Sequence, residues 1–259
     1  MAETRPWCSG NTTAFQAVIT GSTPVGRFPG DYLLGMHAPP PVRGGMVARL
    51  ATLVVGLLVF AAAIVAQLES RLGLSPWDTL HQGIAKHTPL SFGMASICVG
   101  VVVVAIAWAL GAQIGVGTVA NAVLVGGFIQ GLSAIGPIDR LSDASLGVRI
   151  GLLAAAMPLI GIGSVLYLGA WLGAGPRDSL MVVGGERTGL RLGVVRAGLE
   201  LSVLAGGFAL GGTIGVGTIV FALGVGPALE AGFWVLRRSP LAKATSQPLT
   251  PLPAPLAGS

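Results

Sequence analysis

Charged side chains are scarce in this chain, at 10% of 259 residues, where a soluble domain usually has about a quarter. Cysteine is scarcer still: Cys8 lies in a polar N-terminal segment and Cys98 in an apolar run, so we expect neither a disulfide nor a zinc site. The HExxH, GxSxG and CxxC signatures are also missing, so no catalytic residue is predicted. These absences argue against a soluble domain and give no support to an enzyme.

Long apolar runs take the place of the missing charge. The uncharged stretches 50–68, 91–138, 150–176 and 201–229 each equal or exceed the roughly 20 residues needed to cross a bilayer. The second stretch is long enough for two crossings. The sequence therefore predicts a polytopic membrane protein.

The net charge of +5 does not indicate a nucleic-acid partner, because the Lys and Arg residues lie between apolar runs instead of along one surface. We expect membrane lipid as their partner. No secretory signal peptide opens the chain, so we expect the first span to direct insertion. The segments 1–45 and 239–259, rich in Gly, Pro, Ser and Thr or in Pro and Ala, are predicted to be disordered tails.

An internal repeat appears when the sequence is shifted by one hundred positions. LGLSPWDTL at 72–80 then aligns with LGAGPRDSL at 172–180, and ALGAQIGVGT at 109–118 aligns with ALGGTIGVGT at 209–218. About 25 of 85 aligned pairs are identical, and shared Pro, Asp and Thr positions favour duplication over convergent low complexity. The repeats are predicted to occupy 46–138 and 146–238.

Each repeat contains three predicted spans, so the fold class is an all-α membrane protein with about six transmembrane helices. The spans are 48–68, 91–111, 117–136, 149–170, 191–211 and 217–236. Because three is odd, the second repeat must run with inverted topology. The distribution of Arg and Lys favours cytoplasmic N- and C-termini.

A polar segment follows the first span of each repeat. Ser75-Pro76-Trp77-Asp78 is typical of a helix start, and Pro and Asp recur at 176 and 178. About ten helical residues would extend about 15 Å, half of a bilayer core. Two alternatives stay open: half-helices that meet near the midplane with Asp78 and Asp178 on a substrate pathway, or interfacial helices that the Asp residues only cap.

The motif Ile-Gly-Val-Gly-Thr occurs twice, between the last two spans of each repeat. Its predicted structural residues are Gly115, Gly117, Thr118, Gly215, Gly217 and Thr218. Small residues allow close helix packing, and glycine permits a turn with positive φ. The motif lacks the Lys of a phosphate-binding loop, so a tight turn is the favoured interpretation.

Polar residues inside the spans complete the candidate pathway. Arg196 and Glu200 share one face of the fifth span, where they line a pathway or simply neutralise each other. Gln130 aligns with Glu230, either as a pathway pair or as interfacial residues, and Asn121 is a candidate for hydrogen bonding between helices. His81 and His87 lack a partnered ligand set, so neither a metal nor another cofactor is predicted.

The blocks SPWDTLHQG, LSFGMASICVG and IGVGTVANA resemble those of the bacterial YczE/YitT-like membrane proteins, most closely the YczE branch. The resemblance covers about 46–238, although Arg177 replaces Trp and Phe221 replaces Asn in the second repeat. It implies a multi-span helical fold in the bacterial inner membrane and no assigned activity.

The preferred functional hypothesis is a small secondary transporter or permease for a small molecule or ion, since inverted repeats with interrupted helices commonly support alternating access. A scaffold or regulator that docks another membrane protein through its Gly-rich faces is the alternative. An intramembrane enzyme is the weaker one.

Overall fold

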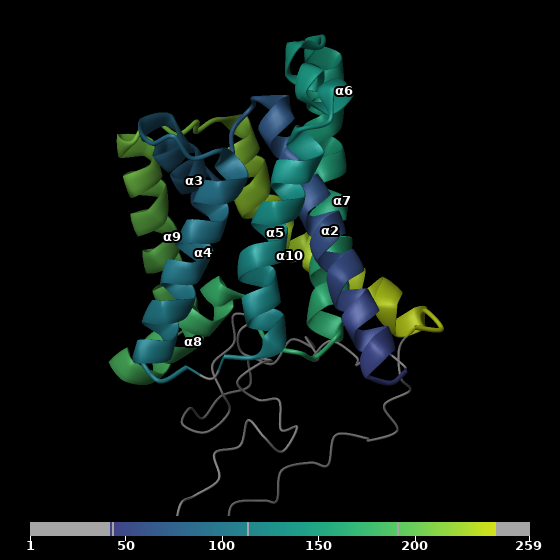
Figure 1. The fold of residues 1–259 in the computed structure, drawn as a ribbon, viewed down its shortest axis with the longest axis vertical. Coiled ribbons are helices and arrows are strands. Elements are labelled where there is room, and N and C mark those ends of the chain that lie inside the picture. The colour runs from purple at the N-terminus through teal and green to yellow at the C-terminus, as the bar shows by residue number, and fades with distance from the viewer. Residues whose placement is uncertain (1–41, 43, 113, 191, 242–259) are drawn as a thin grey trace, which may run out of the picture.

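A computed structural model describes residues 42, 44–112, 114–190 and 192–241 of the chain. The predicted disordered tails therefore lie outside the described residues, apart from 42, 44, 45 and 239–241. Within the described part every regular element is a helix (Figure 1). The predicted all-α class is confirmed.

Eight longer helices form two series of four, joined by a short helical connection. The first series is α2 (Met46–Ser70), α3 (Pro76–His87), α4 (Phe92–Ala109) and α5 (Val116–Ser133). The connection is α6 (Gly136–Asp139) and the 3-10 helix η2 (Arg140–Asp143). The second series is α7 (Leu146–Gly169), α8 (Pro176–Thr188), α9 (Leu192–Ala209) and α10 (Val216–Arg238).

The starts of α3 and α4 follow from local sequence. The Ser75 hydroxyl accepts a hydrogen bond from the Asp78 amide at 3.3 Å, and Pro76 occupies the first helical position, where its missing N–H costs nothing. The Ser91 hydroxyl accepts from the Met94 amide at 3.2 Å in the same way. Serine caps thus set the beginnings of both helices.

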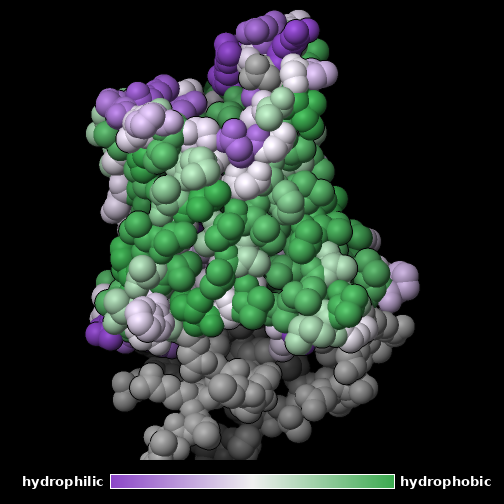
Figure 2. Space-filling model, in the orientation of Figure 1, coloured by the Kyte–Doolittle hydropathy of each residue, from purple (hydrophilic) through white to green (hydrophobic). Residues whose placement is uncertain are grey.

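Five helices are long and apolar enough to cross a bilayer, namely α2, α4, α5, α7 and α10. Helix α9, which is not among these five, occupies the place of the fifth predicted span, has 18 residues and carries both Arg196 and Glu200. Figure 2 shows a broad hydrophobic band over the visible face, with hydrophilic residues gathered chiefly at the upper end. The outer surface is therefore suited to lipid.

Helices α2 and α7 pack closely at the centre of the bundle. A methyl group added at Gly56 would come within 2.5 Å of the Tyr167 backbone nitrogen, and one added at Gly163 within 2.6 Å of the Phe60 nitrogen. Such backbone proximity is what small residues provide at helix interfaces in membranes. Leu53, Leu57, Ile64 and Val165 fill the buried core around this contact.

Three pairs of residues one hundred positions apart share a left-handed backbone. The pairs are Arg71 and Trp171 (φ 50° and 55°), Gly73 and Gly173 (121° and 136°), and Gly111 and Gly211 (97° and 74°). The first two pairs follow the first helix of each series, and the third pair follows the third helix; in both places the left-handed backbone lets the chain turn.

Two arginines, one in each series, cap the end of the first helix of the other series. Arg49, near the start of α2, donates from Nε to the Ala170 carbonyl oxygen at 2.7 Å, just beyond α7. Arg149, near the start of α7, donates from Nε to the Ser70 carbonyl oxygen at 2.7 Å, at the end of α2. Each guanidinium satisfies a terminal carbonyl and places positive charge at the negative end of a helix dipole.

The two Gly-Val-Gly-Thr motifs are held by the opposite series. The Gly117 amide donates to the Leu172 carbonyl oxygen at 2.8 Å, and the Thr118 hydroxyl donates to the Ala174 carbonyl oxygen at 2.6 Å. In the other motif, the Gly217 amide donates to the Leu72 carbonyl oxygen at 2.7 Å. We call these two sets of hydrogen bonds, one at each motif, the reciprocal clasps.

The motif glycines do not adopt the positive φ that the sequence suggested for a turn here. Gly115 has φ −94° and Gly215 has φ −171°. Glycine is needed there because another backbone approaches closely: a methyl group at Gly115 would lie 2.5 Å from the Leu172 carbonyl oxygen. The left-handed turns fall slightly earlier, at Gly111 and Gly211.

The two series differ in how their last two helices pack. Helix α4 lies against α5, and a methyl group at Gly93 would come within 2.5 Å of the Gly126 carbonyl oxygen. Helix α9 instead packs on α3 and has few contacts with α10. Gly226, the counterpart of Gly126, has no neighbour within 4 Å of an added methyl group among the described residues.

Candidate functional site

The short helices α3 and α8 lie toward opposite ends of the bundle in Figure 1, yet their first turns meet inside it. The Arg177 guanidinium lies over the Trp77 indole ring, 5.0 Å from its centroid. Trp77 is only 5% exposed, whereas an interfacial helix would leave it at the surface. The geometry favours the alternative in which two half-helices meet.

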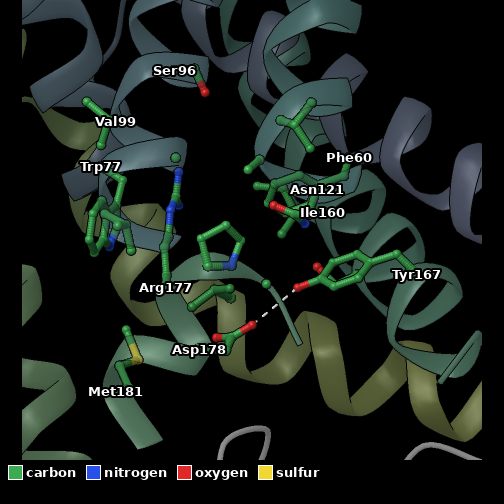
Figure 3. Close-up of a pocket in the computed structure, with 18 of the residues that line it drawn as sticks. Phe60, Trp77, Ser96, Val99, Asn121, Ile160, Tyr167, Arg177, Asp178 and Met181 are labelled. Carbon is green, nitrogen blue, oxygen red and sulfur yellow. Dashed lines mark hydrogen bonds between the residues drawn. The ribbon is translucent and has the colours of Figure 1, made fainter. Parts of the chain in front are cut away.

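A cavity of about 140 Å³ opens where these first turns meet (Figure 3). All eight longer helices contribute to its lining. The polar lining comes from Trp77, His81, Ser96, Asn121, Ser164, Tyr167, Arg177, Asp178, Arg196 and Glu200. The apolar lining includes Phe60, Val125, Ile160, Leu168, Met181 and Phe221.

Four of the predicted pathway residues line this cavity: Asn121, Asp178, Arg196 and Glu200. Arg196 Nε and Glu200 Oε1 are 3.0 Å apart, so the pair is neutralised within α9 and also lines the cavity. Asp178 Oδ2 accepts a long hydrogen bond of 3.5 Å from the Tyr167 hydroxyl. The structure thus brings together residues from four helices.

Asp78 lies behind the cavity wall. It is 2% exposed and its Oδ2 accepts a hydrogen bond from the Ser75 hydroxyl at 2.5 Å. Its Oδ1 is 3.4 Å from Nδ1 of His81, which itself lines the cavity. The two aligned aspartates therefore have different surroundings.

Gln130 and Glu230 lie outside the cavity lining. Both are exposed, and Gln130 Oε1 accepts a hydrogen bond from the Ser91 hydroxyl. The six motif residues, Gly115, Gly117, Thr118, Gly215, Gly217 and Thr218, also lie outside the lining and form the clasps and helix starts described above. Among the described residues, no three His, Cys, Asp or Glu side chains are placed to hold a metal ion.

Tyr167 was missed at the sequence level. One signal was available: it aligns with Gln67, so both series carry a buried polar side chain at this position of the first helix. Gln67 Nε2 is 3.4 Å from the Gly217 carbonyl oxygen and supports a clasp, whereas Tyr167 faces Asp178. Arg177 was recognised only as a departure from Trp, although the structure places its charge in the cavity.

The charges that line the cavity balance. Arg177 and Arg196 supply two positive charges, and Asp178 and Glu200 supply two negative ones. Ionisable groups in an apolar surrounding are costly unless they are paired, so this balance stabilises the site. A ligand that keeps the balance is favoured over one that adds a single charge.

The fold and the cavity define an all-helical membrane protein with a polar interior site. The chain belongs to a family of unknown function, DUF6198, which matches residues 47–232. It is similar to the uncharacterized membrane protein YczE of Bacillus subtilis, with 34% identity over 192 residues that cover 71% of this chain and 85% of that protein. The predicted YczE-like resemblance is confirmed.

An uncharacterized protein of Haemophilus influenzae is also similar, with 35% identity over 192 residues. These residues cover 72% of this chain and 86% of that protein. No solved structure matches the chain.

Proposed function

We infer that the protein is a small secondary transporter of the bacterial inner membrane, built from two inverted three-span repeats with cytoplasmic termini. The helix order α2 to α5 recurs as α7 to α10, with first helices of 25 and 24 residues and short helices of 12 and 13. The start of α2 and the end of α10 lie toward the same end of the bundle (Figure 1). Both features support this architecture.

The observation that carries the proposal is the charged cavity at the meeting point of α3 and α8. Interrupted helices with their first turns at an interior site are the arrangement in which many secondary transporters bind substrate between repeats. Ionisable residues inside a membrane protein are expensive to maintain and usually mark a pathway. Asp178, Arg177 and the Arg196–Glu200 pair are the proposed pathway residues.

Reconstitution into liposomes tests the proposal. We expect currents on a solid-supported membrane when a panel of small polar solutes is applied under ion or pH gradients. Asp178→Asn should reduce the flux at least about tenfold, because it removes one charge from a balanced cavity. Arg187→Gln is the matched control, since Arg187 Nε donates to the Leu110 carbonyl oxygen at an exposed site outside the cavity lining.

Absence of flux for the whole panel, together with an intact cellular phenotype in the Asp78→Ala, Asp178→Ala double variant, would overturn the transporter proposal. If the unaltered protein transports none of the panel but captures a stoichiometric membrane-protein partner, the scaffold alternative is favoured instead.

A further inference from the structure

The side of the cavity formed by Trp77 and Arg177 carries hydrogen-bond donors that no protein group uses. Within the described part of the chain, Arg177 stacks on Trp77 and makes no hydrogen bond. The buried Nε1 of Trp77 also lacks a partner there. A guanidinium has five N–H donors in a planar fork that matches the two oxygens of a carboxylate. This side is therefore suited to a carboxylate.

Hydrogen-bond acceptors lie around Gly175, at the start of α8. A methyl carbon added at Gly175 would lie 3.2 Å from Asp178 Oδ2 and 3.7 Å from the Tyr167 hydroxyl oxygen, and both of these oxygens can accept hydrogen bonds. The Asp178 carboxylate has about four acceptor positions; the Tyr167 hydroxyl uses one at 3.5 Å and the Gly175 amide another, which leaves about two for a ligand. This side is suited to an ammonium group.

Arg177 and Asp178 are neighbours in sequence but turn to different parts of the cavity, as Figure 3 shows. Arg177 extends beside Trp77, and Asp178 is directed toward Tyr167. The other two charges, Arg196 and Glu200, already neutralise each other at 3.0 Å. A ligand with one positive and one negative end would engage both sites without adding net charge to a buried region.

The remaining lining is apolar and the space is small. Phe60, Ile160 and Leu168 form part of this wall. The cavity volume of about 140 Å³ compares with about 10–15 Å³ for one water molecule by the same kind of measure. A ligand on the order of ten non-hydrogen atoms fits.

We propose that the cavity binds a small zwitterion, an amino acid with an apolar side chain, with its carboxylate at Arg177 and Trp77 and its ammonium at the Asp178 carboxylate and the Tyr167 hydroxyl oxygen. This inference rests on the proposed transport function, whose substrate class it names. Its test is a binding measurement that does not require transport.

The full chain in lipid nanodiscs is titrated calorimetrically with leucine, with 4-methylpentanoate, which lacks the amino group, and with 3-methylbutylamine, which lacks the carboxylate. We expect leucine to bind at least about tenfold more tightly than either analogue, because each lacks one charge-assisted contact. Equal affinity for leucine and one analogue would overturn the proposal. So would no binding of leucine to protein that still unfolds cooperatively on heating.

Variants assign the two ends of the ligand. Arg177→Gln should remove the preference for leucine over the amine, and Asp178→Asn the preference over the carboxylate. Trp77→Phe keeps the aromatic face but removes the Nε1 donor, so leucine affinity should fall several-fold while the protein stays folded. Arg187→Gln should bind leucine as the unaltered protein does, and its weakening in parallel with Arg177→Gln would overturn the assignment.

Gly175→Ala provides a further check, because it adds a methyl group beside the proposed ammonium position without changing charge. Leucine affinity should fall and affinity for 4-methylpentanoate should not; the reverse pattern would overturn the placement. Leucine binding without flux would contradict transport and leave this inference standing. Flux of other solutes without leucine binding would support transport and overturn this inference.

Discussion

Arg49 and Arg149 show how single side chains join the two helix series. Each guanidinium donates to carbonyl oxygens at the end of the other series' first helix: Arg49 to Ala170, and Arg149 to Ser70 and Arg71. These carbonyls have no partner within their own helix, so the arginines meet a need that every helix end creates. Charge-assisted bonds of this kind are stronger than neutral ones.

We predict that Arg49→Ala and Arg149→Ala each lower the free energy of unfolding by roughly 1.5–3 kcal/mol. The measurement is thermal or denaturant unfolding of the purified protein in detergent. Asp143→Ala is the control: it breaks an exposed ion pair with Arg71, with 3.7 Å between the charged atoms, and should change stability by less than about 1 kcal/mol. Equal effects of the three substitutions would contradict the capping role.

At the scale of elements, the reciprocal clasps fix the starts of α5 and α10. A methyl group at Gly217 would collide with the Gly73 carbonyl oxygen, which belongs to the backbone and cannot swing away. Gly226, on the same helix, has open space around it. The same substitution should therefore be much more costly at Gly217 than at Gly226, nine residues further along.

We predict that Gly217→Ala destabilises the protein by roughly 1–3 kcal/mol through overpacking. Gly226→Ala should cost less than Gly217→Ala, because the added methyl group meets open space and the helix preference of alanine offsets part of the crowding that Pro227 imposes on the residue before it. Unfolding midpoints of the two variants, measured side by side, test the prediction. It fails if Gly226→Ala is the more damaging of the two.

The elements that local sequence controls were predictable. Ser75 and Pro76 predict the start of α3. Five of the six predicted spans correspond to helices that meet the length and apolarity expected of a membrane crossing. The packing between elements was not, because it depends on residues far apart in the chain. Nothing near Trp77 indicates that Arg177 will stack on it, and the local sequence around Gly226 does not reveal that it lacks the close neighbours of its counterpart Gly126.

The candidate site was predictable to the same extent. Repeat alignment found Asp178 because Asp78 occupies the same register, and charge inside an apolar run found Arg196 and Glu200. Alignment also suggested Gln130 and Glu230, which the structure places outside the cavity lining. Depth along a helix can be read from sequence, but the direction that a side chain faces within a bundle with little amphipathic contrast cannot.

At the scale of the whole molecule, the two short helices provide a test of the proposed inverted topology. Helices α3 and α8 end at His87 and Thr188 toward opposite ends of the bundle (Figure 1). Thr88 and Thr188, one hundred positions apart, are both exposed.

We predict that single cysteines at Thr88 and Thr188, in a chain whose Cys8 and Cys98 are replaced by Ser, are labelled from opposite sides of the membrane. A membrane-impermeant maleimide applied to intact and to permeabilised spheroplasts makes the measurement. Labelling of both positions from the same side would contradict inverted repeats.

The reciprocal clasps also constrain how the protein is made. When α5 leaves the ribosome, the Leu172–Ala174 segment that receives the Gly117 amide and the Thr118 hydroxyl has not yet been synthesised. The Leu72 carbonyl oxygen lacks its donor for longer still, because Gly217 is synthesised near the end of the helical part of the chain. Until then these polar groups lack their final partners in a membrane that offers little else to bond. The two halves must therefore mature together, and a nascent chain that stops after α7 would be a substrate for membrane proteolysis instead of a smaller working unit.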